Sequence, residues 1–341
     1  MNSIEKSYFG KLPNGDDVKI FKLKNSSGIE IDIITYGGII TSIKVPDKKG
    51  KFDNIVLGFN TLDRYLKNNA YLGAIIGRFT NRIANAIFKL NGIAYKVASN
   101  LGNNHIHGGN KGFDKVIWSA KTEIEDDNVR LILHYLSKNG EENYPGNLNV
   151  TVIYSLTNDN ALEIEYKATT DKKTIINLTQ HSYFNLSSNY KESILDHKVQ
   201  INANHYLPID NDSIPTGIIA DVVNTSYDFR KIKTIEKGYD HCWVLNKNPQ
   251  EFSFAAKAYH PSSGRILEVF TTEPGIQFYT GNFINEKRTK TDSTEFKNYS
   301  GFCFETQHFP NSTNEPKFPS VVLNPDETYY SKTVFKFTVQ S

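Results

Sequence analysis

Apolar and polar residues alternate along much of the chain. Isoleucine occupies every second position of residues 29–33, and apolar residues do the same in 148–156, 162–166 and 335–339. A period of two is typical of half-buried β-strands, whereas an amphipathic helix would repeat every three to four residues. The pattern therefore predicts a protein built mainly of strands.

Signals for turns and helices are unequal in strength. Asn91-Gly92 separates two short runs and predicts a hairpin with a type I′ turn, because both residues accept a positive φ. The best helical signal is short, with Thr61 expected to cap the segment 62–66. The sequence thus predicts an all-β fold with very little helix.

The strand-like segments follow one another without a break. They run from residue 18 to residue 339, with no linker, repeat or low-complexity block between them. A single antiparallel sandwich over residues 1–341 explains this more simply than two domains. Aromatic residues make up 12% of the chain, and large rings pack well between two pleated faces. We therefore expect one all-β domain.

The charge of the chain argues against several classes of partner. Lysine and arginine number 39 against 37 acidic residues, which leaves a net charge of +2 and no long run of one sign. Binding to nucleic acid would need a basic surface, so no such partner is expected. No stretch is apolar enough to span a membrane, so no membrane association is expected either.

The first residues and the cysteines bear on the cellular compartment. Residues 1–12 mix charged and polar side chains and contain no apolar segment of the kind that directs export. Cys242 and Cys303 each lie beside aromatic residues, and we expect buried reduced thiols rather than a disulfide. These features favour a cytoplasmic protein.

Three short segments carry side chains suited to proton transfer or ligand binding. His107 precedes Gly108 and Gly109, whose missing side chains let a ligand approach the backbone closely. His181 is followed by aromatic and apolar residues that would hold its ring partly away from water. Glu305 ends a short apolar run, where burial would raise its pKa. Each also admits a structural explanation: a turn, a satisfied core histidine, or a strand-end glutamate paired with an arginine.

Two further clusters could bind hydroxyl groups. Residues 77–83 contain two arginines and an asparagine, and residues 238–241 place Asp240 in a turn. Planar polar groups of this kind form paired hydrogen bonds with adjacent hydroxyls of a sugar. Taken alone, either cluster is explained more simply by surface salt bridges.

Taken together and in this order, the motifs resemble those of the aldose 1-epimerase family, the galactose mutarotases. One motif alone is weak evidence, whereas six in register are specific, and the resemblance extends from residues 36–38 to residues 325–329. The motifs are GRFTNRI (77–83), IHGG (106–109) with GFDK (112–115), HSYFNL (181–186), DH (240–241), GIQFYTGN (275–282) and ETQ (305–307).

The resemblance implies a fold, an activity and a site. The fold would be the family's β-supersandwich, two large antiparallel sheets packed face to face with the sugar site in an open cleft. The enzyme would interconvert the α and β anomers of free hexoses such as galactose and glucose, without cofactor or metal, as a monomer or homodimer. Glu305 would be the general base and His181 the general acid. The residues implied in sugar binding are Asn81, Arg82, His107, Asp240 and Gln277.

Two positions depart from the family's commonest pattern. Thr80 stands where alanine is usual, and Gln180 stands where asparagine is frequent before the histidine. Neither departure touches an atom implied in proton transfer. They leave the preferred sugar open.

Three other functions fit parts of the pattern. A non-catalytic carbohydrate-binding protein on the same scaffold would keep the binding residues without needing both an acid and a base. A metal-dependent isomerase of the cupin kind could use His105 and His107 as a ligand pair if they lay on a strand. A hexose-phosphate epimerase would need an additional basic site for the phosphate.

Overall fold

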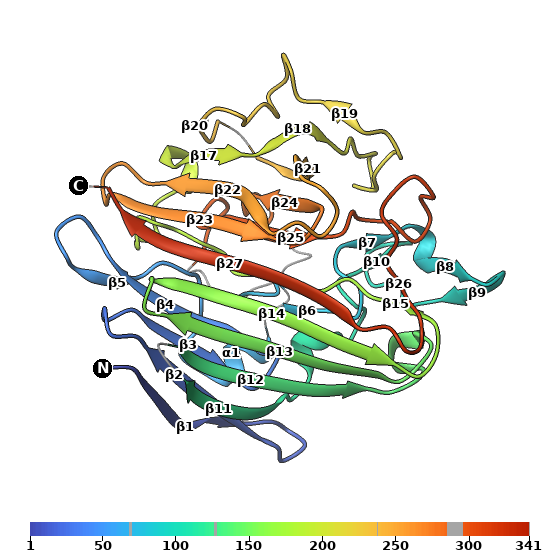
Figure 1. Ribbon diagram of the computed structural model, residues 1–341, viewed down its shortest axis with the longest axis horizontal. Helices are drawn as coiled ribbons and strands as arrows, with labels where there is room; N and C mark the ends of the chain where they lie inside the picture. The colour runs from blue at the N-terminus through green and yellow to red at the C-terminus, as the bar shows by residue number, and fades with distance from the viewer. Residues whose placement is uncertain (68–69, 126–127, 237, 285–295, 341) are drawn as a thin grey trace.

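The largest element of the fold is an antiparallel sheet of nine strands (Figure 1). The computed structural model describes residues 1–341 except 68–69, 126–127, 237, 285–295 and 341. The longest strand, β27, lies in the middle of the nine-stranded sheet. In spatial order the strands are β11 (Ser119–Glu125), β12 (Asn128–Ser137), β13 (Leu148–Thr157), β14 (Ala161–Thr170), β27 (Tyr329–Val339), β23 (Arg265–Thr271), β22 (Ser253–Tyr259), β17 (Lys198–Ile201) and β20 (Lys233–Thr234).

Two five-stranded sheets complete the main architecture. The first is a simple meander of β1 (Ser3–Lys11), β2 (Asp17–Lys24), β3 (Glu30–Ile34), β4 (Ile40–Pro46) and β5 (Phe52–Asn54). The second has the spatial order β19 (Ala220–Asp221), β18 (Ala203–Tyr206), β21 (Asp240–Leu245), β24 (Gly275–Tyr279) and β25 (Cys303–Gln307). Neighbouring strands within both sheets are antiparallel.

Short elements fill the connections between the sheets. The two-stranded pairs are β6 (Ile75–Ile76) with β16 (Thr179–Gln180), β7 (Arg82–Ile83) with β10 (His105–Ile106), β8 (Ile87–Leu90) with β9 (Ile93–Lys96), and β15 (Thr174–Ile175) with β26 (Val322–Leu323). Helical segments in the described residues are α1 (Leu62–Leu66) and four 3₁₀ turns, η1 (Ala84–Ala86), η2 (Phe113–Lys115), η3 (Glu141–Asn143) and η4 (Ile194–Asp196).

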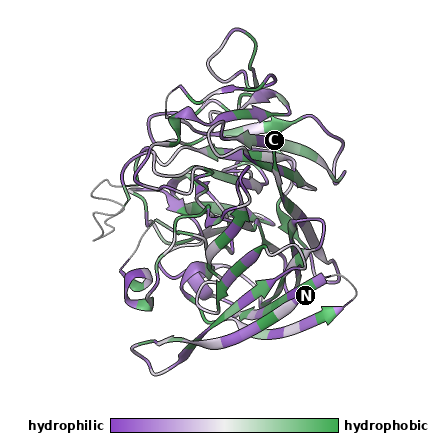
Figure 2. Cartoon of the chain, turned by 90° about the vertical axis from the view of Figure 1, so that its left-hand side faces the viewer, coloured by the Kyte–Doolittle hydropathy of each residue, from purple (hydrophilic) through white to green (hydrophobic). Residues whose placement is uncertain are grey.

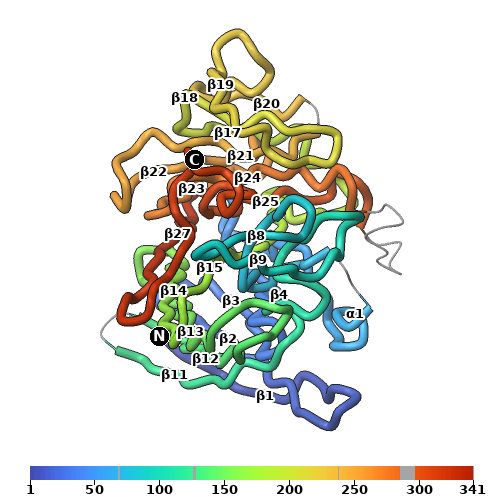
Figure 3. The backbone as a smooth tube through the Cα atoms, turned by 90° about the vertical axis from the view of Figure 1, so that its right-hand side faces the viewer, coloured from blue at the N-terminus to red at the C-terminus, as the bar shows by residue number. Residues whose placement is uncertain are grey.

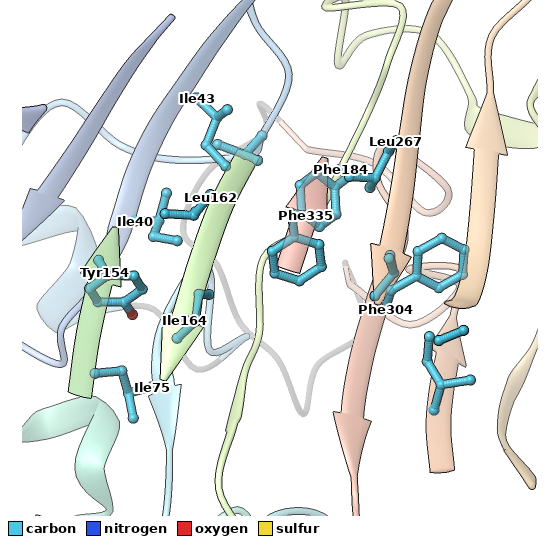
Figure 4. Packing of buried hydrophobic residues seen from close by; sticks show 14 of the residues in the cluster. Ile40, Ile43, Ile75, Tyr154, Leu162, Ile164, Phe184, Leu267, Phe304 and Phe335 are labelled. Carbon is cyan, nitrogen blue, oxygen red and sulfur yellow. The ribbon is translucent and has the colours of Figure 1, made fainter. Parts of the chain in front are cut away.

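One buried apolar cluster draws side chains from all three sheets. Figure 4 shows Ile40 of β4 beside Leu162 of β14, with Phe335 of β27 and Phe304 of β25 further along the same layer. Both five-stranded sheets therefore share a core with the nine-stranded sheet, and the predicted all-β sandwich is confirmed. The single domain stays a prediction, which this shared core favours.

The alternating segments became strands where the pattern predicted them. Residues 148–156 and 162–166 fall within β13 and β14, and residues 335–339 end β27. Figure 2 shows the matching alternation of hydrophilic and hydrophobic colour along several strands. The Asn91-Gly92 hairpin is confirmed as well, with φ of 51° and 78° at the two turn residues between paired Leu90 and Ile93.

The expected short helix is present, but its predicted cap is wrong. Thr61 stands at the N-cap with an extended backbone, and its side chain makes no capping hydrogen bond. The helix is held instead by burial of Leu62 and Tyr65. The Tyr65 hydroxyl also accepts a hydrogen bond from the backbone N–H of Phe59, at 2.8 Å. Tertiary packing has replaced local capping in this short segment.

His197 and His260 share a carboxylate partner, Asp196. His197 Nδ1 lies 2.8 Å and His260 Nε2 lies 3.1 Å from the two carboxylate oxygens of Asp196. His197 Nε2 accepts the backbone N–H of Leu186, at 2.9 Å. That acceptor role leaves the ring proton on Nδ1, facing Asp196, so this cluster holds the segment after His181 and does not suit a metal ion.

The remaining general predictions concern thiols and membranes. Cys242 and Cys303 are both free and buried, as predicted. No helix in the described part of the chain is long and apolar enough to cross a membrane.

Leu162 provides a test of the shared core. It is fully buried in β14, so Leu162→Ala should lower the free energy of unfolding by about 2–5 kcal/mol through lost contacts and a cavity. Leu136 lies in β12 of the same sheet but is 47% exposed, and Leu136→Ala should cost less than about 1 kcal/mol. Urea unfolding measures both, and equal losses would contradict the packing described.

Candidate active site

A polar cleft of about 750 Å³ opens beside β24 and β25. Figure 3 shows the teal hairpin of β8 and β9 on the side of the molecule that faces the viewer, and residues between 100 and 110, which follow this hairpin in the chain, line the cleft. The residues predicted from the sequence that line it are Asn81, Arg82, His107, His181, Asp240 and Glu305. Gln277 is the exception and lies behind Asp240. Segments more than 200 residues apart in the sequence thus meet in one cleft.

Strand β25 fixes the position of Glu305. Its neighbours Phe302 and Phe304 point into the main core, so alternation along the strand turns Glu305 to the other face. Glu305 pairs in register with Gln277 of β24 and is 2% exposed. Its Oε2 atom has no hydrogen-bond partner among the described residues. The carboxyl group is therefore buried with one oxygen available to a ligand.

His181 is held by the short pairing of β16 with β6. The backbone N–H of His181 donates to Ala74 at 2.9 Å, and its carbonyl accepts from Gly73 at 2.9 Å. The side-chain amide of Gln180 donates to the carbonyl of Gly73 at 2.7 Å and accepts from the backbone N–H of Ser182 at 2.7 Å. Gln180 therefore satisfies buried backbone groups on both sides of the histidine.

The two groups predicted to transfer protons are neighbours in the structure. His181 Nε2 lies 3.6 Å from Glu305 Oε2, and both side chains are buried. Burial raises the pKa of Glu305 well above its ordinary value; the charge of Asp240 adds to this, and Arg82 opposes it. Burial also lowers the pKa of His181 to about 4. The site thus disfavours charge on either group, and among the described residues no arginine forms the ion pair with Glu305 that a structural role would require.

A hydrogen-bonded chain of polar groups lies next to the pair. Arg82 Nη2 lies 3.2 Å from Asp240 Oδ2, and Gln277 Nε2 donates to Asp240 Oδ1 at 2.6 Å. Asn81 Oδ1 accepts from the backbone of Arg82 at 2.9 Å and from its Nη1 at 3.3 Å. Arg82 and Asp240 are each only partly buried, so these groups face the cleft in fixed directions.

His107 presents a donor to the cleft. Its Nδ1 accepts the backbone N–H of Asn81 at 3.3 Å, which leaves the ring proton on Nε2. The backbone of His107 has a φ of 50°, and Gly108 follows with a φ of 87°. A Cβ at Gly108 would lie 1.8 Å from the carbonyl oxygen of Gly77, so only glycine fits there. The backbone therefore turns sharply at these residues.

The hydrogen bonds of His105 and His107 argue against a metal site built from these histidines. His105 does not pair with His107, because its Nδ1 lies 2.8 Å from the carbonyl of Ala98 and its Nε2 contacts the Tyr144 hydroxyl. His107, His181 and Glu305 lie close enough to share an ion. His107, however, would have to lose the proton that its acceptor role places on Nε2. The donor set therefore does not suit a metal.

Comparison with known proteins agrees with this geometry. The sequence model described as aldose 1-epimerase matches residues 19–336. Galactose mutarotases from Sus scrofa and Homo sapiens are 44% and 42% identical to the chain, over 99% of it and 100% of their own length. The chain belongs to the aldose 1-epimerase family. The crystal structure of a galactose 1-epimerase from Lactobacillus acidophilus covers 100% of both chains at 28% identity, with a TM-score of 0.85.

In this member of the aldose 1-epimerase family, aromatic rings supply walls that sequence reasoning missed. The ring centroids of Tyr183 and Tyr71 lie 5.0 and 6.0 Å from that of His181, at interplanar angles of 30° and 29°. Tyr279 and Phe283 also line the cleft. Tyr183 stood inside a quoted motif, but Tyr71 has no periodic context and a φ of 56°, so no local signal identifies it.

The buried charge of Glu305 should be visible in stability. Because its folded pKa is raised, ionisation costs folding free energy as the pH rises from the ordinary range near 4.5 towards the folded value. Glu305→Gln removes that cost, since an amide does not ionise. The thermal midpoint of the variant should exceed that of the wild type at about pH 8, and the two should converge towards about pH 4.

Glu273 is a control of opposite sign. Burial opposes its charge, but His308, 2.6 Å away, and smaller contributions from other groups together outweigh burial and lower the pKa of Glu273. Burial also opposes charge on His308, but the charge and hydrogen bond of Glu273 raise the pKa of that ring, so the ion pair is fully formed between the ordinary pKa values of 4.5 and 6.5. Glu273→Gln should therefore lower the thermal midpoint at about pH 6. A Glu305→Gln protein destabilised in the same way would contradict the electrostatics described.

Proposed function

We propose that this protein is an aldose 1-epimerase that interconverts the α and β anomers of free hexoses such as galactose and glucose. The observation that carries the proposal is the buried pair of His181 Nε2 and Glu305 Oε2, 3.6 Å apart in the wall of a polar cleft. A cleft of about 750 Å³ is of the size that binds small molecules. Family membership supports the proposal. Action in the cytoplasm as a monomer or homodimer stays a prediction from the sequence.

The spacing of the pair suits the reacting atoms of an aldose. The hydroxyl oxygen O1 and the ring oxygen O5 are both bonded to the anomeric carbon, C1, so acid and base must reach two neighbouring oxygens. Heavy atoms that exchange a proton stand about 2.6–3.2 Å apart. Two groups separated by 3.6 Å can each reach one of these oxygens without moving far.

Because burial favours the neutral pair, the proposed reaction begins when the proton of Glu305 passes to Nε2 of His181, which leaves Glu305 ionised and His181 protonated. Glu305 takes the proton of the C1 hydroxyl while His181 delivers its Nε2 proton to O5, and the C1–O5 bond breaks to leave an open-chain aldehyde. After rotation about the C1–C2 bond, the C5 hydroxyl attacks the other face of the aldehyde. His181 then takes the C5 hydroxyl proton and Glu305 returns its proton to O1, which restores both groups.

The environment of the pair favours this exchange. A raised pKa makes Glu305 a better base, and a lowered pKa makes protonated His181 a stronger acid. The ionised pair and the neutral pair carry the same net charge. The substrate can therefore pass a proton between them without the buried site gaining or losing charge.

The remaining polar groups are proposed to hold the sugar. Asn81, Arg82, His107 and Asp240 face the cleft, and Gln277 holds Asp240 from behind. The buried Nε atom of Arg82 has no partner in the described part of the chain. The aromatic walls suit the apolar face of a pyranose ring. Orientation by several such groups brings the anomeric centre to the acid–base pair.

The rival functions receive less support from the cleft. A protein that only binds carbohydrate has no need for a poised acid beside a poised base. Among the described residues, one arginine and one lysine line the cleft, Arg82 and Lys115. Arg82 lies 3.2 Å from Asp240, and Lys115 lies 3.5 Å from Asp114. Both cations are already paired, which disfavours a phosphorylated hexose.

Polarimetry on freshly dissolved α-galactose and α-glucose tests the function. The protein should accelerate the change in optical rotation, and EDTA should not reduce the rate. His181→Asn and Glu305→Gln keep size and hydrogen-bonding reach but cannot exchange a proton at neutral pH. Each should lower kcat by roughly 10²–10⁴.

Glu273→Gln makes the same chemical change at a second buried glutamate, outside the cleft. Per folded molecule it should retain the wild-type kcat. A Glu305→Gln protein with near-native kcat would show that another residue is the base.

Arg82 and Asp240 are expected to bind hydroxyls without transferring protons. Arg82→Ala and Asp240→Ala should each raise KM by roughly 10- to 100-fold, the value of a hydrogen bond to a charged group, with a smaller effect on kcat. Arg230→Ala removes an arginine from an exposed ion pair with Asp228 and should change neither constant. Loss of kcat at unchanged KM would give Arg82 or Asp240 a different role.

A further inference from the structure

Strand β25 presents two side chains to the two nitrogens of one imidazole. Cys303 and Glu305 are two positions apart, so both side chains leave the strand on the same face. Glu305 Oε2 lies 3.6 Å from His181 Nε2, and Cys303 Sγ lies 3.5 Å from His181 Nδ1. The ring of His181 is therefore flanked at both nitrogens by a single strand.

The other side chains around His181 in the described part of the chain make no hydrogen bond with Nδ1. Two tyrosine rings cover the faces of the imidazole, and a second histidine ring meets it edge to face. In the described part of the chain, Cys303 is the side chain within hydrogen-bond distance of Nδ1. The groups that face the ring, besides Cys303, are Tyr71, Tyr183, His107, Glu305 and, through its charge, Asp240.

The proposed reaction fixes what Nδ1 must do. If Nε2 gains and loses the transferred proton, Nδ1 keeps its own proton throughout, because a ring without either proton would be an anion. Nδ1–H therefore needs an acceptor in both states of the ring. The backbone carbonyl of His181 itself accepts a ring proton, and Cys303 Sγ is the side-chain candidate.

We propose that Cys303 is a positioning residue whose sulfur accepts the Nδ1–H of His181 and keeps Nε2 directed at Glu305 and the cleft. This inference rests on the function proposed above. Burial, reinforced by the charge of Glu305, raises the pKa of the Cys303 thiol well above its ordinary value, so the sulfur is uncharged. It orients the ring without adding a negative charge beside it.

A sulfur acceptor at Nδ1 also affects the acid strength of protonated His181. A neutral thiol is a weak acceptor, whereas an oxygen acceptor would stabilise the protonated ring more strongly. A weak partner at Nδ1 leaves protonated His181 a strong acid, which suits delivery of a proton to a weakly basic ether oxygen. Cys303 thus combines orientation with little stabilisation of the imidazolium.

Substitutions at Cys303 separate these two effects. Cys303→Ala removes the acceptor and should lower kcat by roughly three- to tenfold at unchanged KM, the value of one ordinary hydrogen bond. Cys303→Ser restores an acceptor and should recover most of kcat. Because its oxygen is the stronger acceptor, it should raise the titration midpoint of His181 by roughly half to one pH unit and shift the pH–rate profile in the same direction.

The titration is measured by NMR on ¹⁵N-histidine-labelled protein, with His181 assigned by its absence in His181→Asn. Cys242 is the chain's other buried free cysteine and lies outside the cleft, so Cys242→Ser is the matched control and should leave the titration and kcat unchanged. An unshifted titration in Cys303→Ser, an unchanged kcat in Cys303→Ala, or an equal shift in Cys242→Ser would overturn the proposal. Since the titration needs no turnover, it remains readable even if polarimetry shows no activity, which would refute the proposed function instead.

Discussion

The removal of water from His181 and Glu305 is the constraint on which the rest of the site depends. Transfer of a charged group from water into a protein interior is costly, and each of these two side chains is at most 4% exposed. Burial destabilises the charged form of each group. The neutral pair and the ionised pair differ only by one proton, which can pass from one group to the other. The buried Oε2 of Glu305, which has no hydrogen-bond partner among the described residues, is tolerated because the carboxyl group can be neutral. A surface pair of the same composition would not have this property.

The fold maintains this constraint through the large core. Phe302 and Phe304 anchor β25 in the layer shared with the nine-stranded sheet, so the positions between and after them have no freedom to turn towards water. The proposed base, Glu305, therefore sits on a strand whose placement is fixed by extensive apolar burial, whereas the proposed acid, His181, follows the two-residue strand β16. Of the groups proposed to bind hydroxyls, Asn81, Arg82 and His107 lie on or beside the two-residue strands β7 and β10. Asp240, expected in a turn, instead begins β21. Asn81 and His107 both have a positive φ, a strain that cooperative packing around β7 and β10 has to support.

The fold and much of the site could be predicted from the sequence, for different physical reasons. Alternation and the Asn91-Gly92 turn are local rules, and both predicted their elements correctly. The prediction that Thr61 caps the helix was wrong, because a helix this short is stabilised by tertiary packing rather than by local capping. The cleft residues were found through their motifs, since the distance between residues such as Arg82 and Asp240 is set by long-range topology. Tyr71 could not be predicted, because its position depends on a strained backbone and on rings that are remote in sequence.

The two departures from the family pattern lie outside the cleft. Thr80 and Gln180 are both buried and neither lines the cleft. The Thr80 hydroxyl lies 3.5 Å from the carbonyl of Ile76, and the Gln180 amide is used by backbone groups around His181. Both substitutions therefore act on the support beneath the site. Contacts that distinguish one hexose from another are therefore expected from the polar and aromatic residues that line the cleft rather than from Thr80 or Gln180.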